Sequence, residues 1–200
     1  MRPQGTRGPV WVAATMAAVA AGAPVAGAAG ERLTKLSPTL EAAGRLATLE
    51  SVRRPLPPEA VFPVRGKVGW GEHAARFGSW RGGHRHEGQD VFAAAGTPLL
   101  AIRDGRVVET GDDGGRGNYI AIWSRRAART FVYLHMRRPS RFRPGDSVDA
   151  GERVGAVGCT GSCWGHHLHL EVREGRGTTG PARDPLPLLR RLAARRGARE

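Results

Sequence analysis

The segment "GHHLHLEVR" (residues 165–173) decides the fold, because polar and apolar side chains alternate along most of it. Such alternation is typical of a β-strand whose two faces meet different surroundings. The period of two places His167, His169 and Glu171 on one face and the apolar residues on the other. One face of this strand therefore packs into a core, while the other presents two imidazoles and a carboxylate.

The surrounding sequence, from Val61 to about Val172, has the pattern of a β-rich domain. Short apolar runs such as "NYIAIWS" (118–124), "TFVYLHM" (130–136) and "ERVGAVG" (152–158) are separated by Gly, Asp and Pro. The sequence therefore predicts a mainly β domain whose antiparallel strands form a β-sheet or a β-sandwich-like fold.

Two finer predictions concern a turn and a strand face. The Asp-Gly pair at 104–105 lies between two apolar runs and predicts a hairpin turn, because glycine accepts positive φ. In the segment 130–136, the period of two groups His135 with Phe131 and Tyr133. On this basis we expect His135 to face a cleft shared with the other histidines.

The segment "HRHEGQD" (84–90) supplies a second set of polar groups. His86 and Asp90 are four residues apart, which places them on one side of a strand or of a helical turn. Gly88 between them disfavours a helix. The segment also lacks the helical H-E-x-x-H motif, since Asp90 stands where that motif has its second histidine.

Together the two segments offer the ligands of a hydrolytic zinc site. Such a site needs three protein ligands and an open fourth position, and zinc accepts imidazole and carboxylate groups. His86, Asp90 and one histidine of the later cluster would supply this set. An H-x-H pair alone is a common chance feature of β surfaces, and spacing alone leaves open His84 or His86, and His166, His167 or His169.

Both ends of the chain differ from this β-rich region. Residues 1–28 combine two arginines, an apolar run and a small-residue exit, and predict a cleaved signal peptide with no stable membrane insertion afterwards. Residues 29–60 are a linker with room for a short amphipathic helix, and the domain spans 61–190. "DPLPLL" (184–189) predicts an extended stretch, and 191–200 a frayed basic tail.

The chain of 200 residues carries a net charge of +13, which raises the question of nucleic-acid binding. The positive charges are mainly arginines scattered among alanines and glycines, with no aromatic-interleaved stripe of the kind that binds single strands. We therefore expect no nucleic-acid partner. In an exported protein the charge would favour anionic polymers such as those of a cell wall.

Several motifs in one order then point to a family: "HEGQDVFAAAGTPLLAIRDGRVVETG" (86–111), "FVYLHM" (131–136), "RPGDSVDAGERVGAVGCTGS" (143–162) and "GHHLHLEVR" (165–173). Over about 62–189 the sequence resembles the lysostaphin-type, or LytM-like, zinc metallopeptidases that cut peptides of bacterial peptidoglycan. The resemblance implies an exported endopeptidase with Zn²⁺ as cofactor and stem or cross-bridge peptides as partners, acting in the periplasm, cell wall or medium.

The resemblance also assigns roles to individual residues. The H-x-x-x-D pair of the family falls on His86 and Asp90, and the last histidine of its H-x-H motif falls on His169, which gives three metal ligands. His135 and His167 match the two catalytic histidines that do not bind metal. The Pro that usually precedes H-x-H is His166 here, while His73 and His84 are expected at the surface.

Cys159 and Cys163 lie in the Gly-rich turn before the histidine strand. In an oxidising compartment a disulfide between them is the favoured state, and it would stiffen this turn.

Two other functions compete with the hydrolase. A non-catalytic relative could bind cell wall or activate another hydrolase, but such relatives lose metal or catalytic residues that this chain keeps. A biotinyl or lipoyl carrier would share the turn at 143–158, but Lys67 is the only lysine of the domain and no Met flanks it.

Overall fold

The computed structural model describes residues 59–198, which lie within one compact unit. Its elements are η1 (His73–Ala75), β1 (Gln89–Phe92), β2 (Pro98–Leu100), β3 (Gly105–Asp113), β4 (Gly117–Ser124), β5 (Arg129–Met136), β6 (Ser147–Val148), β7 (Arg153–Ala156), β8 (His167–Glu174), β9 (Ala182–Arg183) and α2 (Leu186–Gly197). The predicted mainly antiparallel β fold is therefore confirmed.

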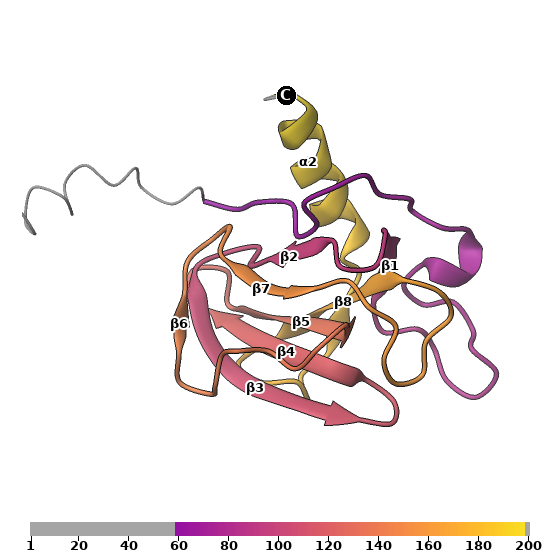
Figure 1. Ribbon diagram of the computed structural model, residues 1–200, viewed down its shortest axis with the longest axis horizontal. Coiled ribbons are helices and arrows are strands. Elements are labelled where there is room, and N and C mark those ends of the chain that lie inside the picture. The colour runs from indigo at the N-terminus through magenta and orange to yellow at the C-terminus, as the bar shows by residue number, and fades with distance from the viewer. Residues whose placement is uncertain (1–58, 199–200) are drawn as a thin grey trace, which may run out of the picture. The chain divides into compact units, whose positions relative to one another are not determined.

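A seven-stranded sheet forms the body, and six of its strands follow the order β1-β8-β5-β4-β3-β6 (Figure 1). The seventh strand, β9, pairs with β8. Strands β2 and β7 form a separate two-stranded sheet. All strand pairs are antiparallel. The strand β8, which begins at His167, thus lies inside the large sheet between β1 and β5.

The main core is formed by one face of the large sheet, the small sheet and α2. It includes Leu99 from β2, Phe131 from β5, Val154 from β7, Leu168 from β8 and Leu189 from α2. Burial of these apolar side chains, each worth about 1.5–3 kcal/mol, is the main stabilising contribution. The opposite face of β8 is left to carry the histidines.

Two sequence expectations about connections are wrong. The Asp-Gly pair at 104–105 does not turn a hairpin, because β2 pairs with β7 while β3 pairs with β4 and β6. The chain instead crosses there from the small sheet to the large one.

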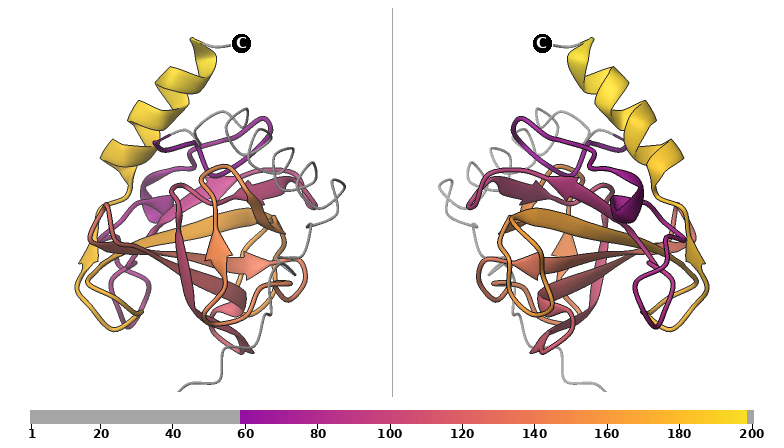
Figure 2. Two further views of the ribbon diagram at one scale, coloured as in Figure 1. Left: turned by 90° about the vertical axis from the view of Figure 1, so that its left-hand side faces the viewer. Right: turned by 90° about the vertical axis from the view of Figure 1, so that its right-hand side faces the viewer.

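The second error concerns the C-terminus. Where an extended stretch and a frayed tail were expected, residues 186–197 form α2, and Figure 2 shows this helix projecting from the β-rich body. Proline is tolerated in the first helical turn, so the helix begins at Leu186 with Pro187 as its second residue. Leu189 and Leu192 anchor the helix in the core. Among residues 59–198, no helix is long and apolar enough to cross a membrane.

One buried hydrogen bond joins the large sheet to the chain segment after β2. The Tyr133 side chain is fully buried, and its hydroxyl oxygen accepts the N–H of Ile102 at 2.8 Å. Tyr133 therefore belongs to the core.

We expect Tyr133→Phe to lower the free energy of unfolding by about 1–3 kcal/mol, because it leaves the buried Ile102 N–H without a partner. Urea denaturation at fixed zinc concentration measures the change. Tyr119→Phe is the matched control: the Tyr119 hydroxyl donates to Glu109, which also accepts from Arg116 and Thr178. Equal losses in the two variants would contradict this account.

Candidate functional site

The register of β1 against β8 brings the two polar segments together. Asp90 on β1 lies opposite His169 on β8, and His169 also lies opposite Leu134 on β5. His86 precedes β1, and its backbone bonds to Ser79 and Gly78 hold it beside that strand. Residues 83 positions apart in sequence therefore share one buried site.

Three ligand atoms form a nearly equilateral triangle. His86 Nε2 lies 3.1 Å from Asp90 Oδ1 and 2.9 Å from His169 Nδ1, and His169 Nδ1 lies 3.0 Å from Asp90 Oδ1. Tetrahedral zinc, with ligand distances of about 2.0–2.1 Å, holds its ligand atoms about 3.3 Å apart. The triangle is thus of the right size and composition to hold a zinc ion, and it is the set His86, Asp90 and His169 that the structure brings together.

In each of the two histidines, the ring nitrogen that points away from the triangle, here called the outer nitrogen, has a hydrogen-bond partner of its own. His86 Nδ1 lies 2.8 Å from the carbonyl oxygen of Arg76, and His169 Nε2 lies 3.3 Å from Glu171 Oε1. Since both outer partners are acceptors, we assign the ring protons to those outer nitrogens. In this assignment the inner nitrogens point lone pairs at each other and at a carboxylate oxygen, an arrangement that a bound cation would stabilise.

Charged neighbours support these ligand groups from behind. Arg81 donates to Asp90 Oδ2 at 2.6 Å, and Arg173 donates to both Glu171 and Glu87. The sequence motifs predict no role for Arg81 or Arg173, because neither residue is part of a recognisable spacing with the histidines. Glu171 could be predicted to lie near the site, because the alternation places it on the same strand face as His169.

The pKa shifts follow from this arrangement. Burial would raise the pKa of Asp90, but its hydrogen bonds with His169 and His86 hold that pKa well below its usual range. Burial would lower the pKa of His169, but Asp90 and Glu171 raise it above its ordinary value. The site therefore keeps a carboxylate ionised and favours positive charge beside it.

His135 reaches the site through a β-bulge, not through regular alternation. The register of β4 against β5 shifts between Asn118 and Ile120, and His135 has φ of +59°. Phe131 and Tyr133 lie in the core, whereas the His135 ring lies 5.0 Å from that of His167. The expectation that His135 shares a face with Phe131 and Tyr133 is therefore wrong, because the bulge turns its side chain to the opposite side.

The two additional histidines share a hydrogen-bonding pattern. His135 Nδ1 lies 2.8 Å from the Thr160 carbonyl oxygen, and His167 Nδ1 lies 2.8 Å from the Gly165 carbonyl oxygen. Both carbonyls accept, so Nδ1 carries the proton and Nε2 carries the lone pair in each ring. His167 Nε2 lies 3.6 Å from Asp90 Oδ1, at the edge of the triangle.

Burial lowers the pKa of both additional histidines. The pKa of His135 falls to about 4, and that of His167 also lies below its ordinary value. Both rings are consequently neutral near pH 7 and able to accept a proton. The remaining histidines, His73, His84 and His166, are exposed, as the sequence predicts for the first two.

Comparison with known proteins now identifies the family. The model of peptidase family M23 matches residues 84–185, just over half of the chain, and this range contains all five site residues. The chain belongs to peptidase family M23. The resemblance inferred from the motifs is thereby confirmed.

Individual curated proteins are similar to part of this chain. Glycyl-glycine endopeptidase ALE-1 of Staphylococcus capitis is 35% identical over 109 residues, covering 54% of this chain and 30% of that protein. Peptidoglycan DD-endopeptidase ShyC of Vibrio cholerae is 38% identical over 88 residues, covering 43% and 19%. The chain thus spans less than a third of the length of these curated relatives.

A solved M23 structure shares the fold. The catalytic domain of the antimicrobial peptidase lysostaphin from Staphylococcus simulans is 31% identical, with a TM-score of 0.54. The match covers 62% of this chain and 92% of the lysostaphin domain. This chain is therefore similar to nearly the whole length of that lysostaphin domain.

The left-handed backbone at His135 leads to a stability prediction. We expect His135→Gly to be more stable than His135→Ala by about 1 kcal/mol, because glycine adopts positive φ without the steric cost that Cβ imposes. Urea denaturation at matched zinc concentration compares the two. At Leu134, which has no positive φ, the order should reverse, with Leu134→Ala the more stable. The same order at both positions would contradict the bulge geometry.

Proposed function

We propose that this chain is an exported zinc metalloendopeptidase that hydrolyses peptide bonds in bacterial peptidoglycan. The observation that carries the proposal is the convergence of three lone pairs, from His86, Asp90 and His169, beside two neutral imidazoles that each present Nε2. Structural metal sites are closed by protein ligands, whereas three ligands with adjacent proton acceptors are typical of a hydrolytic site.

The metal and the histidines would divide the chemistry. Bound zinc would act as a Lewis acid that polarises the scissile carbonyl and lowers the pKa of a water molecule to about 7. In our proposal His135 and His167 perform the proton transfers: a neutral Nε2 accepts a proton from the attacking water, and a protonated ring donates to the developing oxyanion or the leaving amine. Arg81 and Glu171 hold Asp90 and His169 in the orientation that metal binding needs.

The substrate and location are also proposed. ALE-1 and ShyC are named for glycyl-glycine and peptidoglycan DD-endopeptidase activities, which supports stem or cross-bridge peptides of peptidoglycan as the substrate here. The apolar segment with a small-residue exit at residues 1–28, which lies outside the described residues, supports export to the periplasm, the wall or the medium. A net charge of +13 favours association with anionic wall polymers.

The alternative is a relative that binds cell wall or activates another hydrolase without cleaving peptides itself. The complete set of ligand and proton-transfer groups favours the enzyme over this alternative. A nucleic-acid binder would show salt-dependent DNA binding that survives metal chelation.

The metal assignment gives a direct prediction. Elemental analysis of the dialysed protein should find about one zinc per chain, and His169→Ala should lose it, because two remaining ligands bind zinc far more weakly. His84→Ala is the matched control, since His84 is exposed and outside the triangle. Zinc retained in His169→Ala, or lost in His84→Ala, would refute the assignment.

The catalytic assignment separates metal binding from cleavage. In His167→Ala and His135→Gly we expect about one zinc per chain but a rate of cleavage lowered by about 10²–10⁴-fold, the contribution of a positioned acid or base. Release of new amino termini from purified peptidoglycan, with glycine cross-bridges and with direct cross-links, measures the rate. His166→Ala should cleave like the wild type. A zinc-loaded wild type that cleaves neither substrate would favour the non-catalytic alternative.

A further inference from the structure

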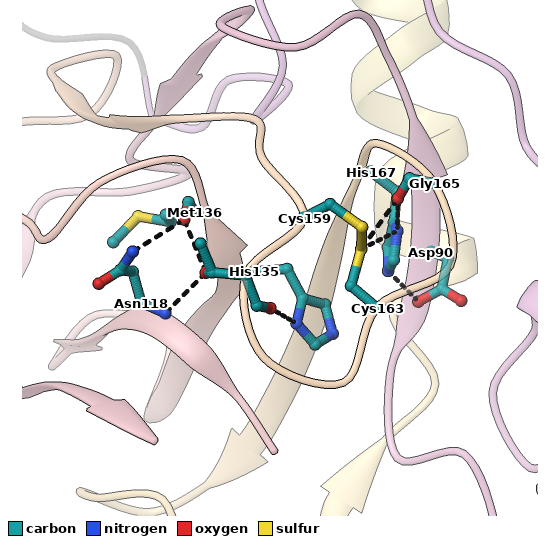
Figure 3. Close-up of a disulfide and its surroundings, with 9 residues drawn as sticks. Asp90, Asn118, His135, Met136, Cys159, Cys163, Gly165 and His167 are labelled. Carbon is teal, nitrogen blue, oxygen red and sulfur yellow. Dashed lines mark hydrogen bonds and ion pairs between the residues drawn. A yellow bond between two sulfur atoms is a disulfide. The ribbon is translucent and has the colours of Figure 1, made fainter. Parts of the chain in front are cut away.

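The turn between β7 and β8 is closed by a disulfide between Cys159 and Cys163, as the sequence favours. Their Cα atoms are 5.3 Å apart. Figure 3 shows this disulfide beside both His135 and His167. No metal ligand of the proposed site lies in this turn.

The turn supplies the outer hydrogen-bond acceptor of both proton-transfer histidines. The carbonyl of Thr160, inside the disulfide ring, accepts from His135 Nδ1, and the carbonyl of Gly165, two residues beyond Cys163, accepts from His167 Nδ1. The sulfur of Cys163 lies 3.0 Å from the Gly165 oxygen and 3.8 Å from His167 Nδ1. One short segment thus determines which ring nitrogen carries the proton in two histidines that come from different strands.

The Thr160 side chain fastens the turn to the sheet. Its Oγ1 accepts the Asn118 N–H at 2.9 Å and donates to the Met136 carbonyl at 2.8 Å. Met136 follows His135 directly, so this anchor holds Thr160 beside the bulge. A Cβ on Gly117 would overlap the Thr160 backbone, which shows how closely the two segments approach.

Besides Thr160, the backbone of Ser162 ties the turn to the sheet, because its N–H donates to the Gly115 carbonyl oxygen at 3.0 Å. Gly161 and Gly165 have φ of +69° and +77°, and both are exposed. Glycine loses the most backbone freedom on folding, so a turn with two such residues would sample other conformations without a covalent link. The disulfide removes many of those conformations.

We infer that the Cys159–Cys163 disulfide and Thr160 are positioning elements that hold His135 and His167 in the tautomer with a proton on Nδ1. Their effect on catalysis rests on the proposed function, because a lone pair on each Nε2 is what the proton transfers require. Since both acceptors are main-chain carbonyls, the side chains that control them are the two cysteines and Thr160.

The first test uses the double variant Cys159→Ser/Cys163→Ser of the purified protein. We expect about one zinc per chain, unchanged KM and kcat lowered by about 10- to 100-fold, comparable to the loss of an outer partner of a metal-bound histidine. In ¹⁵N spectra of the imidazoles, the wild type should show Nδ1–H for His135 and His167, and the variant a mixture of tautomers. Ser162→Ala, in the same ring with an exposed side chain, should match the wild type.

A second pair of variants tests the inference independently in case the double variant does not fold. Thr160→Val loses the Oγ1 hydrogen bonds and should give the same mixture of tautomers and lower kcat, while Thr160→Ser keeps both hydrogen bonds and should restore both readouts. Unchanged tautomers in the folded variants would overturn the inference, as would equal behaviour of Val and Ser at position 160. The spectra need no turnover, so an inactive wild type would refute the proposed function alone.

Discussion

The structure depends on one electrostatic constraint: three buried lone pairs, on two imidazoles and a carboxylate, must lie about 3 Å apart. A cation bound among them would offset their mutual repulsion. The surrounding fold meets this requirement with covalent and hydrogen-bonded supports. β1 and β8 are adjacent and in register, His86 is tied to a loop carbonyl, and Asp90 and His169 have charged partners of their own.

The sheet positions the strand that carries the histidines, and irregular segments next to it complete the site. The core face of β8 packs with Leu168 and Leu170, which fixes the strand, and its other face is left to His167, His169 and Glu171. The bulge in β5 and the turn before β8 then add His135 and the two carbonyl acceptors. Apolar packing thus determines where the strands lie, and irregular backbone determines where the rings of His135 and His167 point.

Much of this could be predicted from sequence, because the relevant signals are local. Alternation in 165–173 identified the β8 face, and the four-residue spacing of His86 and Asp90 placed both on one side of the chain. The choice among neighbouring histidines came from the family resemblance, since spacing alone left His84 and His166 open. The orientation of His135 could not be predicted, because the prediction relied on regular alternation and a bulge breaks that alternation. The turn at 104–105 and the helix at 186–197 were misread because tertiary packing selects among local patterns that fit several structures.

The orientation of His135 and His167 by main-chain oxygens has a consequence for how such a protein can change over evolutionary time. Main-chain carbonyls persist whatever side chain a residue carries, so the exposed positions of the turn that have no positive φ can be replaced while His135 and His167 keep their orientation. Trp164, which is 86% exposed and lies in this turn, is such a position. Selection for a different substrate could therefore act on the outer surface of the turn while its inner, oxygen-lined side stays the same.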